Sequence, residues 1–317
     1  MVAYIIRRLL YVFPIAVGVT FFIFLLVHLA PGDPLNAVVA PDAPAATVER
    51  LKQEYGFDKP LPVQYLIWVS RVVQGDFGVS IATGRPVSAA LGRAVFNTVI
   101  LAFCAAVLGF VLGCIFGGIA GYTQGRWIDK VATAIAITGV SVPHYWLGMV
   151  LVIIFAVELQ MLPAMGMGPG GSTAFSWDPE QLKFLVLPAV TLAVIPLGIV
   201  TRTVRASVSE ILNQEFVETL RAKGLREIRI LLHVVKNVAP TVMAVMGLQF
   251  GYLLGGSILV ETVFSWPGTG FLLNDAIFRR DIPLLQGTIL VLAMFFVFLN
   301  LLVDIAQTAI DPRMRRA

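Results

Sequence analysis

The sequence predicts an all-α protein that crosses a membrane several times. Of its 317 residues, 58% are hydrophobic and only 13% are charged, whereas soluble globular chains are about half apolar and about a quarter charged. Six uncharged stretches are each long enough for a membrane-crossing helix, which takes about 20 residues. Such a composition excludes both a water-soluble globular fold and an intrinsically disordered chain. The fold class is therefore an all-α polytopic membrane protein with six transmembrane helices.

The six expected spans follow one another with more polar segments between them, at Leu9–Ala30, Ala94–Gly121, Val131–Val157, Phe184–Thr201, Val238–Val260 and Ile282–Val303. Arg7 and Arg8 precede the first span, as they would in a secretory signal peptide. Its 22 residues exceed the apolar region of a signal peptide, which is about 7–15 residues, so we expect an uncleaved anchor. Pro143, Pro188 and Pro196 predict kinks in the third and fourth spans.

The distribution of basic residues sets the expected orientation. With the N-terminus in the cytoplasm, fourteen of the 23 lysines and arginines fall on the cytoplasmic side, and the other nine face outward among twelve acidic residues. Membrane proteins carry their excess of lysine and arginine on the cytoplasmic side. Both termini are therefore expected to be cytoplasmic, and residues 311–317 form a short cytoplasmic tail.

The segment Pro31–Arg93 is too long for a simple connection and faces outward in this topology. Prolines favour the first turn of a helix, and glycines are common just past its end. Their positions predict two short helices, Pro44–Tyr55 and Pro62–Gln74, which Gly56 and Gly75 terminate. Residues 1–93 are thus expected to comprise the first span and a small helical cap at the outer mouth.

A second long segment, Arg202–Asn237, lies on the cytoplasmic side. Apolar residues recur in it at helical spacing before and after Gly224, which predicts a helix, a break and a second helix. Its polar faces carry charges of both signs, as either a docking surface or a solvated helix would.

Glycines recur every four residues in two of the spans. Small residues at this spacing allow helices to approach closely in lipid. Tight packing within the helical bundle is the favoured interpretation, and contact with a second membrane subunit is the alternative. The glycines are Gly109, Gly113, Gly117 and Gly121 in the second span, and Gly247, Gly251 and Gly255 in the fifth.

Residues that could carry chemistry are few. The chain has no G-x-x-x-x-G-K-[ST] phosphate loop, no G-x-S-x-G elbow and no H-E-x-x-H pair, and its three histidines have no metal-ligand spacing. His28, in the last turn of the first span, favours a structural role, either snorkelling to the interface or hydrogen-bonded. Gln249 is a weak candidate for the wall of a transport pathway. We expect no catalytic residue and no metal site.

One cytoplasmic stretch carries a specific resemblance. Glu215-Phe-Val-Glu-Thr-Leu-Arg-Ala-Lys-Gly-Leu225, followed by Asn237-Val-Ala-Pro240, resembles the "EAA" loop of ABC importer membrane subunits. Further stretches resemble the dipeptide/oligopeptide (and nickel) permease branch of that binding-protein-dependent family, in its first-permease type. They are Tyr4–Leu9, Leu29–Pro34, Gly56–Tyr65, Gln74–Gly78, Glu261–Gly270 and Asp311–Arg313. The resemblance thus extends along the whole chain.

This resemblance implies a fold and a set of partners. The fold would be the type I ABC importer transmembrane fold, with residues 94–310 as a five-helix core and 202–237 as a coupling loop. The partners would be a second homologous permease, two cytoplasmic ATPase subunits and a periplasmic binding protein, in the bacterial inner membrane. ATP and Mg would bind the ATPases, and this chain would hold no cofactor. The residues implied in ATPase coupling are Glu218, Arg221, Ala222, Lys223 and Gly224.

Several alternatives stay open at the level of sequence. Thr219 and Leu220 follow Glu218 where the family's loop has alanines. The resemblance makes di- and oligopeptides the expected substrates, with nickel complexes, glutathione and oligosaccharides as alternatives within the same class of transporter. An ion-coupled secondary carrier is a second class, although the spans lack the midspan carboxylate that proton coupling would favour. A membrane-embedded enzyme would need a catalytic constellation that the sequence does not contain.

Overall fold

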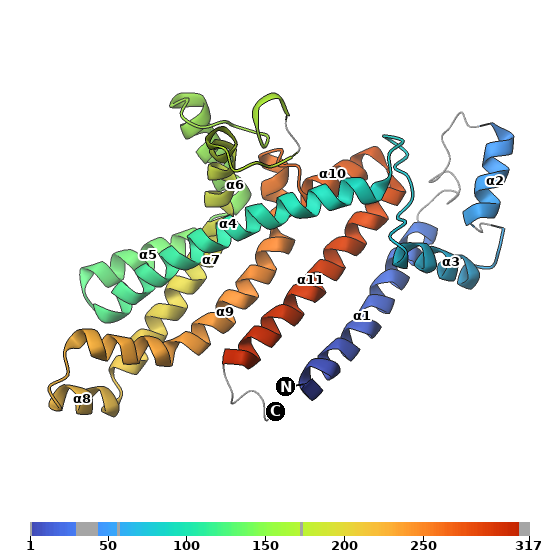
Figure 1. Cartoon of the computed structure of the whole chain (residues 1–317). Helices are drawn as coiled ribbons and strands as arrows, with labels where there is room; N and C mark the ends of the chain where they lie inside the picture. Colours follow the sequence, from blue (N-terminus) through green and yellow to red (C-terminus); the bar gives the residue numbers. More distant parts are fainter. Residues whose placement is uncertain (1, 30–43, 56–57, 172–173, 311–317) are drawn as a thin grey trace. The chain divides into compact units, whose positions relative to one another are not determined.

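A computed structural model describes residues 2–29, 44–55, 58–171 and 174–310. In these ranges the regular structure is helical, apart from one isolated β-bridge between Val79 and Pro86. The α-helices (Figure 1) are α1 (Val2–Leu29), α2 (Ala45–Tyr55), α3 (Leu61–Val73), α4 (Val87–Tyr122), α5 (Trp127–Ser141), α6 (His144–Leu151), α7 (Pro179–Leu212), α8 (Glu215–Ala222), α9 (Glu227–Val263), α10 (Thr269–Arg279) and α11 (Ile282–Ile310). A π-helical segment, Val152–Glu158, continues α6.

The apolar helices agree with the predicted spans in type and order, but not fully in number. Within the described residues, four are long and apolar enough to cross a membrane, namely Val87–Tyr122, Pro179–Leu212, Glu227–Gly255 and Ile282–Leu299. The bent pair Trp127–Ser141 and His144–Glu158 gives a fifth if the two helices are counted as one span. The first predicted span lies on α1, whose apolar run Leu10–Leu26 is shorter than these; Ala30, its predicted end, lies outside the described residues.

The third predicted span is broken rather than kinked. Helix α5 and the helix that begins at His144 differ in direction by 101°, so the prediction of one continuous, kinked span was wrong. The cause is local, because Val142 (φ −82°, ψ 129°) and Pro143 (φ −58°, ψ 121°) both have extended backbone. A proline disfavours helical conformation in the residue before it. By contrast, α7 continues as one helix through Pro188 and Pro196.

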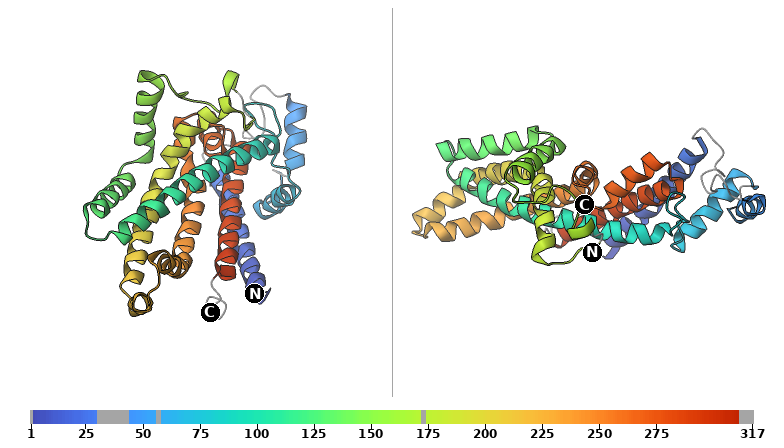
Figure 2. Two further views of the ribbon diagram at one scale, coloured as in Figure 1. Left: turned by 60° about the vertical axis from the view of Figure 1, so that its left-hand side comes forward. Right: turned by 90° about the horizontal axis from the view of Figure 1, so that it is seen from above.

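The chain divides into two compact units. The first contains Val99–Trp266 and the chain from Leu299 onward, and the second contains Val2–Thr98 and Pro267–Phe298. Within the first unit, α7 is the central helix, and α5, α6 and α9 contact it; Figure 2 shows α5 and α9 beside it. The predicted boundary between residues 93 and 94 stays a prediction.

Four glycines of α4 lie directly against α7, which confirms the interpretation of the first glycine series as packing within the bundle. A Cβ atom at Gly117 would lie 2.6 Å from the backbone oxygen of Thr201 and 2.7 Å from the Cβ of Val204. Gly109, Gly113 and Gly121 face α7 with equally little space. In the second series, Gly255 has open space around its Cβ position, so contact with another subunit stays a prediction there.

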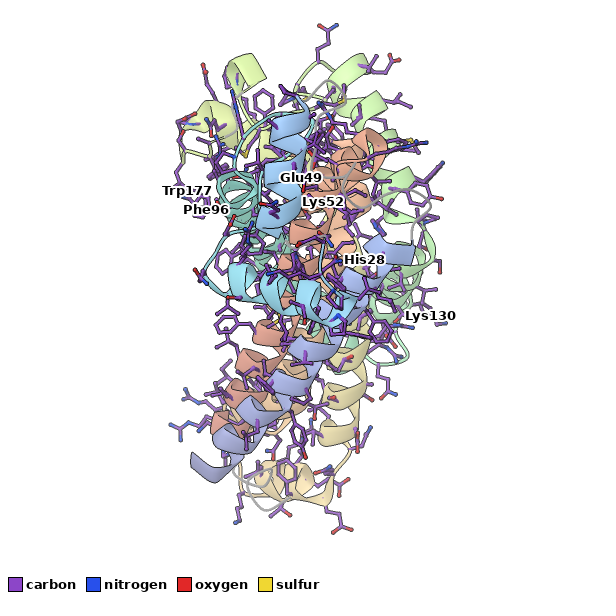
Figure 3. The ribbon with its side chains drawn as sticks, turned by 90° about the vertical axis from the view of Figure 1, so that its right-hand side faces the viewer. His28, Glu49, Lys52, Phe96, Lys130 and Trp177 are labelled. Atoms are coloured by element: carbon purple, nitrogen blue, oxygen red, sulfur yellow. The ribbon has the colours of Figure 1, made fainter. Side chains whose placement is uncertain are left out.

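The insertion that follows α1 belongs to the second unit and contains the two predicted short helices, α2 and α3. Gly75 after α3 has φ +82°, as a helix-terminating glycine should; Gly56 lies outside the described residues. His28 near the end of α1 (Figure 3) is hydrogen-bonded through Nδ1 to the Phe24 carbonyl oxygen (2.9 Å) and through Nε2 to Gln64 Oε1 of α3 (3.1 Å). The structural role predicted for His28 is confirmed.

A buried carboxylate in the same unit was not foreseen. The short helix α10, which the sequence analysis did not predict, ends just before Asp281, whose side chain is fully buried. Asp281 accepts hydrogen bonds from the Ser80 hydroxyl (2.5 Å), the Ala82 N–H (3.2 Å) and the Leu284 N–H (3.2 Å). The loop before α4 is thereby fixed to the beginning of α11.

Replacing Asp281 by alanine should destabilise this unit by about 3 kcal/mol, because several buried donors lose a charged acceptor at once. The thermal unfolding midpoint of the detergent-solubilised protein would measure the loss. The matched control is Asp275→Ala, which removes a partly exposed partner of Arg279 and should change stability by less than about 1 kcal/mol. Equal midpoints for the two variants would contradict the anchoring role of Asp281.

Candidate functional site

Helix α8 is a short, separate helix that follows α7 and precedes α9 in the chain (Figure 1). The sequence predicted one break, at Gly224, and the structure has a second at Asn213–Gln214, so that prediction was incomplete. Gln214 has extended backbone (φ −83°, ψ 146°), and the Asn213 amide donates to the Ser209 carbonyl oxygen (2.8 Å). Asparagine side chains compete in this way with continuation of a helix.

The other end of α8 is closed by a glycine motif. Gly224 has φ +73°, its N–H donates to the Arg221 carbonyl oxygen (2.9 Å), and the Leu225 N–H donates to the Leu220 carbonyl oxygen (3.2 Å). These two bonds define a Schellman motif, in which glycine supplies the left-handed residue. The predicted break at Gly224 is confirmed, and this turn connects α8 to α9, which begins at Glu227.

Helix α8 is fixed to the rest of the unit by apolar contacts on one side. Val217 is fully buried, and Leu220 and Leu225 are partly buried against the same cluster. The cluster joins α7, α8 and α9 through Val200, Val204, Val208, Val217, Ile230, Val234, Val238 and Val242. Full burial of a valine side chain contributes about 1.5–3 kcal/mol, so α8 is held to α7 and α9 although it is only 8 residues long.

The opposite side of α8 is exposed and charged. All five residues implied in coupling are exposed and extend from the middle of α8 into the turn that follows it, namely Glu218, Arg221, Ala222, Lys223 and Gly224. Arg221 Nε lies 3.2 Å from Glu227 Oε1, an exposed ion pair of little energetic weight. Acidic residues in the first turn and Arg221 in the last complement the helix dipole. The site is therefore a charged surface of mixed sign on a fixed apolar base.

Gln249, the weak pathway candidate, is not part of this surface. It lies on α9, roughly 33 Å along the helix from its first residue. Its side-chain oxygen is buried and makes no hydrogen bond within the part of the chain that the structure describes. A buried amide oxygen without a hydrogen bond can accept one from a bound molecule.

Sequence reasoning missed a buried ion pair next to this site. Asp129, in the first turn of α5, is 3% exposed. Its carboxylate accepts hydrogen bonds from Nε and Nη2 of Arg205 on α7, and the bond from Nη2 measures 2.9 Å. The Gly125 N–H (2.9 Å) and the Thr133 hydroxyl (3.2 Å) also donate to it. The sequence placed Asp129 in a connecting loop, and nothing in its spacing pointed to Arg205, 76 residues later.

No metal centre accompanies these residues: among the described residues, no group of three or more histidine, cysteine, aspartate or glutamate side chains could hold a metal ion.

The chain matches known protein families along most of its length. Residues 109–316 match the model described as "binding-protein-dependent transport system inner membrane component", and residues 1–107 match the model of its N-terminal region. The glutathione transport system permease protein GsiC of Escherichia coli K12 is 39% identical over 316 residues, which is 99% of each chain. The GsiC protein of Salmonella choleraesuis is 38% identical over the same extent.

A solved structure shows the same fold. A chain of the methionine ABC transporter MetNI, in an inward-facing conformation, superposes with a TM-score of 0.55 at 18% sequence identity. The match covers 70% of this chain and 96% of that one. The type I ABC importer fold predicted from the sequence is thereby confirmed.

Proposed function

We propose a short-peptide substrate for this chain, which belongs to the family of binding-protein-dependent transport system inner membrane components. It is a permease subunit of an ABC importer and not an enzyme. Family membership sets aside the secondary carrier and the membrane-embedded enzyme. A permease subunit supplies the path through the membrane, and a separate ATPase supplies the energy.

The proposal of a peptide rests on two resemblances of the sequence. The sequence motifs resemble the dipeptide/oligopeptide branch, and the full-length relatives named above are glutathione permeases. Glutathione is itself a tripeptide, so both resemblances favour a small molecule with amide groups and charged ends. Gln249, with its buried and unbonded amide oxygen, is the residue that we assign to the wall of the pathway for such a molecule.

The observation that carries the mechanism is the construction of α8. Its apolar side is fixed between α7 and α9, whereas its charged end is exposed. We assign α8 to the cytoplasmic side, as the element that enters a groove of an ATPase subunit. When the two ATPases close on ATP, a force on α8 would be transmitted to α7 and α9 through Val217 and its cluster, because these helices share one apolar core. A second permease and a periplasmic binding protein complete the assembly.

Replacing Glu218 by lysine should release the ATPase from the permease. Glu218 is exposed on α8, so the change reverses a charge at the proposed contact without disturbing the apolar core. Loss of one charged pair at a buried interface costs roughly 2–5 kcal/mol of affinity, which is a loss of at least tenfold. Purification of the tagged protein in mild detergent, with quantification of the co-purifying ATPase, measures the effect.

The matched control is Glu49→Lys, because Glu49 is an exposed acidic residue on α2 (Figure 3) in the second unit. This variant should retain the ATPase in full. Equal retention by the two variants would refute the contact at α8. Uptake of a labelled dipeptide and of glutathione into vesicles that contain the full transporter tests the substrate; a parent that imports neither would refute the peptide assignment.

A further inference from the structure

Asp129 is buried, Arg205 is partly buried, and the two are bonded more completely than a stabilising surface pair requires. The Asp129 side chain is 4% exposed and that of Arg205 31%. Four donors converge on the two carboxylate oxygens, two of them from one guanidinium. A bidentate arginine–carboxylate pair fixes orientation as well as distance. The pair therefore defines the position of α5 along and around α7.

A second polar contact lies one turn further along α7. The Ser209 hydroxyl donates to Gln124 Oε1 (2.5 Å), which belongs to the turn between α4 and α5. On another side of the same stretch, Gly121 of α4 faces the Arg205 carbonyl oxygen and the Val208 side chain. The stretch of α7 from residue 201 to residue 209 is thus connected to both α4 and α5.

This stretch directly precedes α8. Val204 and Val208, which flank Arg205, belong to the cluster that holds Val217 of α8, and the break at Asn213–Gln214 is only one turn beyond Ser209. Apolar side chains can slide past one another at low cost, whereas a bidentate buried ion pair cannot shift by one residue without losing its bonds. The pair therefore fixes the register between α5 and α7 at this end of their contact.

We propose that Asp129 and Arg205 are positioning residues of the transport cycle, through which a displacement of α8 and α7 is passed to α5. This inference rests on the proposed function of α8 as the contact with the ATPase. In this mechanism α5 follows α7 as a rigid body, and the broken segment at Val142–Pro143 is where its motion meets α6. Without the pair, α7 would move while α5 stayed behind.

The test is a transporter reconstituted in vesicles with its ATPases, second permease and binding protein. Because removing one partner of a buried pair is strongly destabilising, the main variant replaces both: Asp129→Leu with Arg205→Met. An apolar pair of similar volume is compatible with a stable fold. This double variant should retain the parent's ATPase subunits and unfolding midpoint, while the substrate imported per ATP hydrolysed falls roughly 2- to 30-fold.

Two further variants separate positioning from packing. Arg205→Lys keeps the charge but loses the planar fork, and should lower the import per ATP by an intermediate factor. The exchange of the two residues, Asp129→Arg with Arg205→Asp, should restore part of what the apolar double variant loses. The control Asp275→Asn, at the partly exposed pair of the second unit, should leave the ratio unchanged.

The outcomes distinguish this inference from the function on which it rests. If the parent does not couple ATP hydrolysis to uptake, the proposed function fails. If the parent does so and the apolar double variant couples equally well, the positioning role is wrong while the function stands. A double variant in which import, ATPase activity and unfolding midpoint fall together would also overturn it, because the pair would then serve stability alone.

Discussion

Replacing Gly224 by valine is expected to abolish most transport while leaving the protein inserted in the membrane. Gly224 has φ +73° and closes α8. A left-handed conformation costs an L-residue about 1–2 kcal/mol, and a β-branched residue more. Nothing lies within 4 Å of a Cβ at this position, so the penalty comes from the backbone alone. Uptake by the reconstituted transporter should fall by at least roughly tenfold.

Asparagine at the same position is the matched control. Asn tolerates the left-handed region because its short polar side chain can bond locally, so Gly224→Asn should retain most of the uptake, and Gly224→Ala should fall between the two. All three variants should insert into the membrane as well as the parent does. The amount of folded protein extracted from membranes measures this. If the valine variant transports at the parent's rate, the conformation of this turn does not matter to function.

Gly117→Leu is expected to destabilise the first unit strongly. A Cβ at Gly117 would lie 2.6 Å from the backbone oxygen of Thr201 and 2.7 Å from the Cβ of Val204, so α4 and α7 would have to separate. Insertion of bulk into a tightly packed site typically costs about 1–3 kcal/mol, and a clash with backbone belongs at the upper end. The midpoint of thermal unfolding in detergent should fall accordingly.

The neighbouring Gly118 provides an unusually close control. It lies on the same helix, one residue further, but has nothing within 4 Å of its Cβ position. Gly118→Leu gains the same helix propensity as Gly117→Leu and loses no contact. Its unfolding midpoint should equal or exceed that of the parent, and a fall matching that of Gly117→Leu would show that the close approach of α4 and α7 is not the cause.

Features encoded by local sequence were predictable. The helices α2 and α3 follow from prolines and glycines at their ends, and the turn at Gly224 follows from the need for a left-handed residue. The close packing at Gly117 was predictable as packing, because the four-residue repeat has a direct steric meaning. The exposed residues Glu218 and Lys223 came from resemblance to a family rather than from spacing.

Features that depend on distant residues were not predictable. The pairing of Asp129 with Arg205 depends on the register between α5 and α7, which no local pattern specifies. The turn of 101° after α5 exceeds what a proline alone implies, since Val142 is extended as well. The break at Asn213–Gln214 was hidden because the apolar spacing of α7 continues into α8 and suggests one helix where there are two.

The continuity of α7 has a geometric consequence. Its 34 residues correspond to a rod about 51 Å long at 1.5 Å per residue, well beyond the thickness of a bilayer core of about 30 Å. A rotation of such a rod by about 6° about one end moves the other end sideways by about 5 Å. A tilt too small to rearrange side chains at one end would thus be a large sideways displacement at the other.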